Sequence, residues 1–313
     1  MNVCEPPVPG LLLCETHFAF RKEKGIISDA VARIADEGFF GAISIADVEN
    51  KAGRNSIRKT VEAHDVALSQ WTSMVLGDEE LDLCSMDTRH RTRSVARITE
   101  LIDQAAECGV RNLGLLSGPD PGEELRAQAT ASMFESLSEL CDVISTYPGM
   151  RLMLEPLDQD IHKKGLIGPT TEAVALVGHV QESFPAAGLC LDTGHAVLLG
   201  EDPVNSLELM GPHILEIHFS NPVLDRNDPT FGDMHGPPGP PGVLDVADFA
   251  RVLSKGIETG IVTKGRPIVS VEVRTTAGGD PWETVELCKT TISRTWELVQ
   301  ASGKGSDGSV GSD

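Results

Sequence analysis

The chain has 313 residues, and its 26 Lys and Arg stand against 47 Asp and Glu, which gives a formal net charge of −21. A protein this acidic repels the phosphates of nucleic acids and of anionic membranes, so the charge argues against a nucleic-acid enzyme and against a membrane-surface protein. With 40 % hydrophobic and 23 % charged residues, the composition is typical of a soluble globular protein.

Short apolar, β-rich segments alternate along the chain with segments of helical periodicity. We predict eight strands, at 11–20, 41–48, 66–74, 111–117, 151–157, 188–193, 214–220 and 267–274. We predict eight helices, at 26–38, 54–64, 91–108, 123–146, 170–184, 203–211, 245–259 and 281–301. Strict alternation indicates parallel strands joined by crossover helices, and the length is near the ~250 residues typical of a (β/α)8 barrel.

The predicted fold class is therefore α/β, a single (β/α)8 TIM barrel over residues 1–302. A doubly wound open sheet is the alternative, but that fold usually carries a nucleotide-binding glycine loop, and neither G-x-G-x-x-G nor a Walker A motif follows the first strand. The segment 232–242, GDMHGPPGPPG, is predicted to be a stiff loop after the seventh strand. Residues 303–313, rich in Gly, Ser and Asp, are predicted to form a disordered C-terminal tail.

Cysteine usage and the apolar segments indicate where the protein resides. The seven cysteines are odd in number and form no Cys-x-x-Cys pair, which favours reduced thiols. No apolar run approaches the ~18–20 residues of a membrane-spanning helix, and no signal peptide is recognisable. We therefore expect a cytoplasmic protein without nucleic-acid or membrane partners.

Ionisable residues end the last four predicted strands, in the sequences Leu-Glu155-Pro, Leu-Asp192-Thr-Gly-His195, Ile-His218-Phe and Val-Glu272-Val. In a barrel, the carboxyl ends of the strands form the active face. Three carboxylates at one mouth repel one another unless a cation lies among them. Each residue alone would more often cap a helix or pack in the core, but the set predicts one divalent metal ion. Three oxygen ligands and one imidazole favour Mn²⁺ or Mg²⁺ over Co²⁺ or Zn²⁺.

Residue alternation in the strands supports this geometry. In strand eight, Ser270, Glu272 and Arg274 alternate with three valines, which belong against the helices. The polar set is therefore predicted to point into the barrel, and Glu216 is predicted to share the inner face with His218.

These strand ends, together with the loop Gly-Asp233-Met-His235, resemble the xylose isomerase-like TIM-barrel superfamily of sugar and sugar-phosphate isomerases and epimerases. The resemblance runs over roughly residues 150–275. In the ketose epimerases of that family, a glutamate, an aspartate, a histidine and a second glutamate bind one Mn²⁺-type ion. The resemblance implies the same metal ligands here: Glu155, Asp192, His218 and Glu272.

The resemblance also implies catalytic and substrate-binding residues. The two glutamates of the family move protons, so Glu155 and Glu272 are the expected catalytic residues. The family uses a histidine three residues after the aspartate to contact a substrate oxygen, and His195 occupies that position. The apurinic endonuclease branch adds histidines for a three-zinc cluster. The third strand here runs through Ser69-Gln70-Trp71 and the fourth ends in Leu-Ser-Gly, without histidine, which argues against that branch.

Four further residues are candidates for substrate binding, each with a structural alternative. Asp233 and His235 either contact substrate or brace their Gly/Pro loop. His162, followed by two lysines, could bind a hydroxyl or a phosphate or be solvated. Trp71 ends the third strand, where it could form a sugar-stacking wall or pack in the core.

The predicted activity is that of a metal-dependent isomerase or epimerase of a keto-sugar or related polyol ketone. Proton abstraction next to a metal-chelated carbonyl would give an enediolate. A lyase or dehydratase acting through the same enediolate is the alternative. A non-catalytic barrel subunit is disfavoured because all four ligand-type residues are present. In a barrel that had lost its activity, sequence drift would first remove some of the mutually repelling carboxylates. The expected partner is a small carbohydrate, and a homo-oligomer or a partner subunit stays open.

Overall fold

The computed structural model describes residues 7–23, 25–48 and 50–305, in which eight parallel strands close into a barrel in chain order. The strands are β1 (Val8–Leu12), β2 (Ala42–Ile45), β3 (Ala67–Trp71), β4 (Asn112–Leu116), β5 (Arg151–Glu155), β6 (Ala187–Asp192), β7 (Ile214–Phe219) and β8 (Ile268–Val271). The closed barrel confirms the predicted fold class and excludes the open doubly wound sheet.

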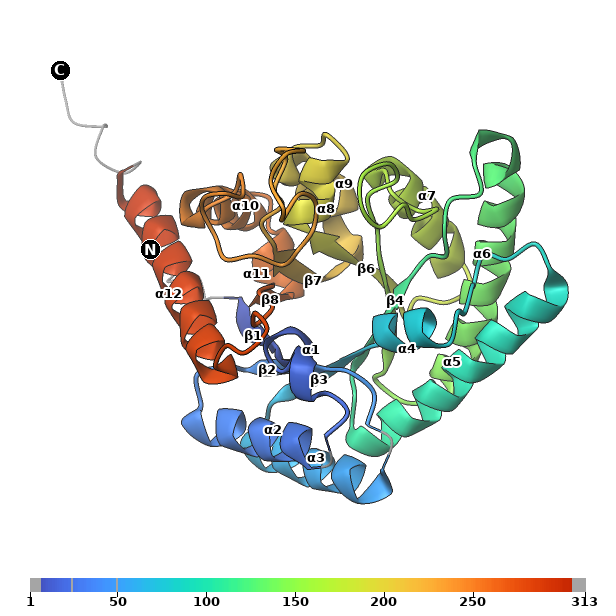
Figure 1. Cartoon of the computed structure of the whole chain (residues 1–313), viewed down its shortest axis with the longest axis horizontal. Helices are drawn as coiled ribbons and strands as arrows, with labels where there is room; N and C mark the ends of the chain where they lie inside the picture. Colours follow the sequence, from blue (N-terminus) through green and yellow to red (C-terminus); the bar gives the residue numbers. More distant parts are fainter. Residues whose placement is uncertain (1–6, 24, 49, 306–313) are drawn as a thin grey trace.

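A ring of longer helices surrounds the strands (Figure 1). Its members are α2 (Ile26–Glu37), α3 (Lys51–His64), α5 (Thr88–Cys108), α6 (Glu123–Ser145), α7 (Thr170–Gln181), α9 (Pro203–Met210), α10 (Val246–Glu258) and α12 (Pro281–Gly305). Shorter helices occupy connections: α1 (Leu13–Thr16), α4 (Ser73–Asp78), α8 (Thr193–Leu198) and α11 (Ile261–Gly265). Of these, α1, α4 and α8 follow the carboxyl ends of β1, β3 and β6 and build the mouth of the barrel.

All eight predicted strands run past the observed strand ends at the barrel mouth, and the first and the third, for example, run into a helix. The first was predicted at 11–20, but β1 ends at Leu12 and the next four residues form α1. The third was predicted at 66–74, but β3 ends at Trp71 and α4 begins at Ser73. All four residues of α1 are buried, and a short helix that is buried all round has the same apolar composition as a buried strand.

The ends of the chain lie partly outside the described residues. The helix α12 continues to Gly305, past the predicted domain end at residue 302. The remainder of the predicted tail, 306–313, lies outside the described part of the chain, as do residues 1–6. The segment 232–242 forms neither helix nor strand and belongs to the connection between β7 and α10, as predicted.

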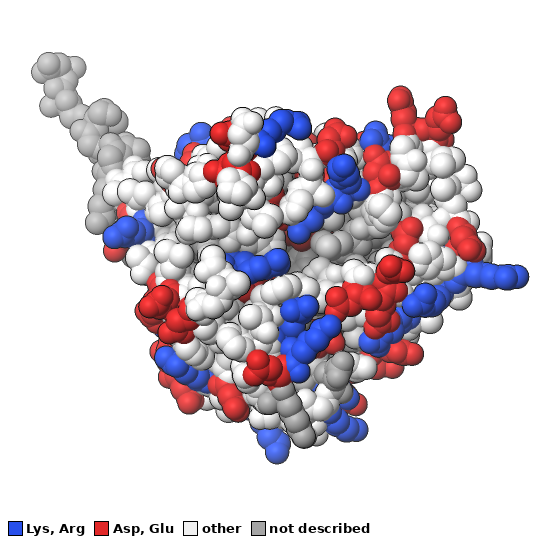
Figure 2. Space-filling model, in the orientation of Figure 1, with Lys and Arg blue, Asp and Glu red and all other residues white. Residues whose placement is uncertain are grey.

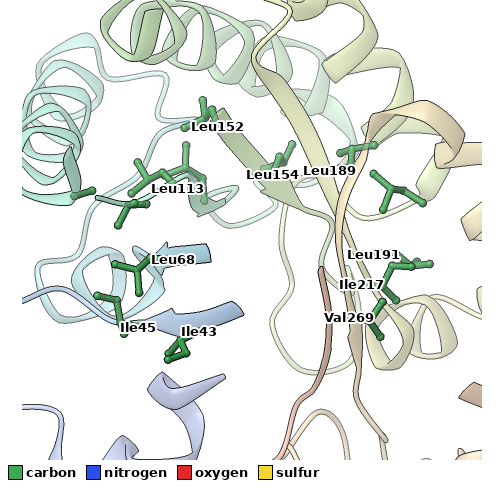
Figure 3. Packing of buried hydrophobic residues seen from close by; sticks show 14 of the residues in the cluster. Ile43, Ile45, Leu68, Leu113, Leu152, Leu154, Leu189, Leu191, Ile217 and Val269 are labelled. Carbon is green, nitrogen blue, oxygen red and sulfur yellow. The ribbon is translucent and has the colours of Figure 1, made fainter. Parts of the chain in front are cut away.

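The main hydrophobic core lies between the outer face of the barrel and the helices. Figure 3 shows its strand residues, which alternate along each strand, for example Leu152 and Leu154 in β5. The valines of strand eight, Val269, Val271 and Val273, belong to this core, as the alternation predicted. Fully burying such a side chain stabilises the fold by about 1.5–3 kcal/mol. The alternating apolar residues of this core therefore face the helices, and the residues between them face the interior of the barrel.

No helix in the described residues is both long enough and apolar enough to cross a membrane. Six of the seven cysteines fall within the described residues, and all six are buried and free of disulfides, as the sequence predicted.

His17 lies between α1 and the outer helices, and its environment predicts an acid-sensitive contact. Its ring meets Trp282 edge-on at 5.0 Å. Burial, and then the charge of Arg33, lower the pKa of His17 to about 4. In the unfolded chain the pKa of His17 is about 6.5, so the unfolded chain binds a proton on this imidazole more tightly than the folded chain does. The stability contributed by neutral His17 is therefore complete above pH 6.5 and is lost as the pH falls through 4.

We therefore expect His17→Phe, which keeps a ring against Trp282, to lose less thermal stability than the wild type between pH 7 and pH 4. Melting temperatures across this interval measure the effect. Equal losses in the two proteins would show that His17 does not titrate as the structure indicates.

Candidate metal centre and its pocket

The four predicted metal ligands meet at the mouth of the barrel. Glu155 and Asp192 are the last residues of β5 and β6, and His218 lies opposite Asp192 in the register of β6 and β7. Glu272 directly follows β8, and its backbone N–H donates to the carbonyl of Phe219 in β7. One ligand atom from each of the four residues lies within 4.8 Å of the others, which places all four within reach of a single ion.

The imidazole of His218 tests whether a divalent cation fits this cluster. Its Nδ1 lies 3.5 Å from Glu155 Oε1 and 3.2 Å from Glu272 Oε2, and it has no hydrogen-bond partner among the described residues. A buried polar atom without a partner is rare in folded proteins. A divalent cation fits this donor set, because it would satisfy the nitrogen and offset the repulsion of the three carboxylates.

The aspartate is held by the helix that follows it. Asp192 Oδ1 accepts hydrogen bonds from the backbone N–H of His195 at 2.8 Å and from Ser220 Oγ at 2.6 Å, and the first of these caps α8. A side chain at Gly194 would collide with Ser220, since an added Cβ would lie 2.3 Å from its Oγ. The Asp-Thr-Gly-His motif therefore fixes one carboxylate oxygen and leaves Oδ2 for the cluster.

Burial raises the pKa of Glu272 to about 7, against the lowering influence of His235 and His218. Nearby Asp192 adds to the increase. A carboxyl group at this pKa is half protonated near neutral pH when no cation is present, and a bound cation would lower the value.

His195 lies beside the four-residue cluster and lines the same pocket. Its Nδ1 is 3.6 Å from Asp158 Oδ2 and its Nε2 is 3.8 Å from Asp233 Oδ2. Burial alone would lower its pKa, but Asp233 and Asp158 raise the pKa of His195 to about 9. The imidazole is therefore cationic at neutral pH, with N–H groups available to an oxygen acceptor. Its role as a substrate contact stays a prediction.

The Asp-x-His loop is tied to the site by a network of charges. His235 Nε2 lies 2.8 Å from Asp233 Oδ2, and His235 Nδ1 lies 2.7 Å from Glu15 Oε2 and 3.4 Å from Glu272 Oε1. Arg274 donates to Glu15 through Nε at 2.6 Å and Nη2 at 3.0 Å. These contacts brace the loop, and His235 also lines the pocket. Substrate contacts by Asp233 and His235 remain predictions.

The pocket at the barrel mouth has a volume of about 330 Å³, within the range of small-molecule sites. Its charged and imidazole side chains come mostly from the β5–β8 half of the barrel. Its apolar lining comes mostly from the other half: Leu12, Cys14, Phe18, Trp71, Met74 and Leu116. Figure 2 shows this face, with basic and acidic side chains intermingled around a central hollow.

Trp71 packs in the core, and its role as a sugar-stacking wall stays a prediction. It lines the pocket, yet it is buried in a small apolar cluster within the barrel, with its ring 5.1 Å from that of His218. The indole lies directly on Gly114, where an added Cβ would come within 2.5 Å of the ring.

The sequence did not identify three charged residues of the pocket: Glu15, Lys163 and Arg274. It gave no reason to choose Lys163 over Lys164, and it did not pair Arg274 with Glu15. Lys163 Nζ lies 3.2 Å from Asp233 Oδ2 and lines the pocket, whereas His162 packs beside Gly232. The predicted role of His162 in substrate binding stays untested. The lysine pair after His162 was the one signal that could have indicated Lys163.

Comparisons with known proteins agree with this geometry. A family model described as a xylose isomerase-like TIM barrel matches residues 21–266. A sequence comparison with curated proteins finds no match.

Solved structures with the same fold include several sugar epimerases. A D-psicose 3-epimerase from Clostridium cellulolyticum H10, solved with D-tagatose, has a TM-score of 0.66 at 15% identity, covering 93% of this chain and 98% of that one. The 3-keto-D-glucoside 4-epimerase YcjR from E. coli has a TM-score of 0.63 at 14% identity, covering 85% and 92%. The IolI protein, solved with a zinc atom, has a TM-score of 0.66 at 15% identity, covering 93% and 98%. Because the family model spans most of the chain, this protein belongs to the xylose isomerase-like TIM-barrel family.

Proposed function

We propose that this protein is a divalent-metal-dependent isomerase or epimerase that acts on a keto-sugar or a related polyol ketone. The observation that carries the proposal is the convergence of Glu155, Asp192, His218 and Glu272, in which His218 Nδ1 has no hydrogen-bond partner among the described residues. Similarity to a D-psicose 3-epimerase and a 3-keto-D-glucoside 4-epimerase supports the choice of substrate class.

The cluster is proposed to hold one divalent ion. Such an ion would act as a Lewis acid that polarises the substrate carbonyl and stabilises the negative charge that develops on its oxygen. Three carboxylates and one imidazole favour Mn²⁺ or Mg²⁺, and the zinc atom in the IolI structure keeps Zn²⁺ among the candidates, with Co²⁺.

The two glutamates are proposed to move the proton. Glu155 and Glu272 both line the pocket, at the ends of β5 and β8, so a substrate bound there would meet them from different strands of the barrel. One removes the proton from the carbon next to the carbonyl, and the other returns a proton. Return to the same carbon on the opposite face gives an epimer, and return to the neighbouring carbon gives an isomer.

A lyase or dehydratase is the alternative, because it begins with the same proton abstraction. Cationic His195 in the pocket supports this alternative, since an N–H at this position could protonate the oxygen of a leaving group. The two activities differ in their products rather than in their first step.

The test is to reconstitute chelator-treated protein with Mn²⁺, Mg²⁺, Co²⁺ or Zn²⁺ and incubate it with a panel of keto-sugars and polyol ketones. We expect metal-dependent interconversion of at least one substrate, followed by NMR and chromatography. An elimination product would identify the lyase. A protein that binds metal but turns over no member of a broad panel would contradict the proposed substrate class.

His195→Ala is expected to retain the metal ion and to weaken substrate binding or turnover. The reason is that His195 lies outside the four-residue cluster but lines the pocket. Metal content together with KM and kcat measures the effect. A folded but metal-free His195→Ala protein would show that this histidine is a ligand.

A further inference from the structure

Glu216 is a fully buried carboxylate that the proposed chemistry does not use. It lies in β7 two residues before His218, so both side chains point into the barrel, with Glu216 one layer deeper. Burying a carboxylate in a barrel interior is unfavourable unless its surroundings compensate. Its contacts therefore indicate what it is for.

Side chains of β3, β4 and β7 contact this carboxylate. Glu216 Oε1 accepts hydrogen bonds from Ser69 Oγ in β3 and from Asn112 Nδ2 in β4, the latter at 2.8 Å. Asn112 Oδ1 in turn accepts from Arg151 Nε in β5 at 3.1 Å. The other oxygen, Glu216 Oε2, lies 3.4 Å from His218 Nε2. One oxygen is thus anchored to the barrel, and the other is directed at the imidazole.

This contact favours the tautomer of His218 that carries its proton on Nε2. Glu216 Oε1 already accepts two hydrogen bonds from β3 and β4, and Oε2 faces the ring, where a carboxylate oxygen is matched by an N–H donor. A neutral imidazole with its proton on Nε2 has its lone pair on Nδ1. In this structure Nδ1 is the unpartnered atom that lies between Glu155 and Glu272.

We propose that Glu216 is a positioning residue for the metal centre, which holds His218 with Nε2 protonated and offers Nδ1 to the ion. The inference rests on the proposed metal-dependent function, because it needs the four-residue cluster to bind a cation. Carboxylate partners of metal-bound histidines act in this way generally, and their loss costs about 10–100-fold in metal affinity or activity.

The test measures Zn²⁺ affinity by competition with a fluorescent chelator, without substrate. Glu216→Gln replaces the carboxylate by an amide of the same shape, and Glu216→Leu removes the acceptor altogether. We expect both to bind Zn²⁺ about 10–100-fold more weakly than the wild type, with the larger loss in Glu216→Leu. Ser44→Ala is the matched control, because Ser44 is a buried serine opposite Ser69 in the register of β2 and β3, and its hydroxyl has no hydrogen-bond partner among the described residues. Its Zn²⁺ affinity is expected to stay near that of the wild type.

Two further measurements separate positioning from a structural role. The melting temperature of metal-free Glu216→Gln is expected to stay at or above that of the wild type, because an amide is easier to bury than a carboxylate. In the Zn²⁺-loaded wild type, ¹⁵N NMR is expected to show a proton on His218 Nε2 that exchanges slowly with solvent, and this proton is expected to exchange faster in Glu216→Gln.

Unchanged Zn²⁺ affinity in both Glu216 variants would overturn the inference and leave the metal centre intact. Equal losses of affinity and melting temperature in Glu216→Gln and Ser44→Ala would assign Glu216 a structural role instead. A wild-type protein that binds no Zn²⁺, Mn²⁺ or Co²⁺ would overturn the proposed function and this inference together.

Discussion

Asp192→Ala and His218→Ala are each expected to abolish both metal binding and activity. Each change removes one of four side chains whose ligand atoms lie within 4.8 Å of one another. Without Asp192 or His218, water would have to replace one of the four protein ligands, and the site would lose the affinity that this carboxylate or imidazole supplies. Elemental analysis of protein purified without chelators, and again after reconstitution, is expected to give about one ion per wild-type chain and none in the variants.

Asp202→Ala is the matched control for the aspartate. Asp192 also caps α8, and Asp202 caps α9 in the same way, through a hydrogen bond to a backbone N–H. Losing either cap costs about 0.5–2 kcal/mol of stability, so Asp202→Ala reports the effect of a lost helix cap without the loss of a proposed metal ligand. Three zinc ions per wild-type chain, or no metal after careful reconstitution, would contradict the one-metal centre.

The barrel could be predicted from sequence because its pattern is repeated along the whole chain. Alternating residues such as Leu152 and Leu154 identify a strand and its outer face, and each such strand is followed by a helix. The errors fall where a strand enters the barrel mouth. Leu13 and Cys14 are as buried in α1 as they would be in a strand, so composition alone did not show where β1 ends.

The candidate site was predictable to the extent that the strands position it. Glu155 and Asp192 end strands, and parallel strands bring their carboxyl ends to one mouth, so their convergence follows from the topology. The pair of Glu15 and Arg274 was not predictable in this way. The two residues are 259 positions apart, and the Glu15 segment was assigned to a strand rather than to the helix that aims its side chain at Arg274.

The second large effect concerns exchange of substrate hydrogen with solvent. Turnover in D₂O is expected to place deuterium on the carbon next to the carbonyl, because every proposed outcome begins with a carboxylate that takes a carbon-bound proton. Glu272→Gln is expected to slow this exchange by about 10²–10⁴-fold, the usual effect of losing a general acid or base. Glu155→Gln is expected to do likewise. Mass spectrometry of product, and of substrate recovered before completion, measures both.

Proton removal depends on the ion as well as on the glutamates, because neither glutamate is a strong base on its own. A carboxylate that ligates a cation has a lowered pKa, so proton removal depends on how acidic the polarised carbonyl makes the neighbouring C–H. Glutamine keeps the shape and an oxygen ligand but cannot accept that proton. Product without deuterium would indicate an internal hydride shift or a proton shielded from water. A full primary isotope effect in a Glu272→Gln protein as fast as the wild type would overturn the two-glutamate mechanism, because the proton would then be leaving to a group other than Glu272.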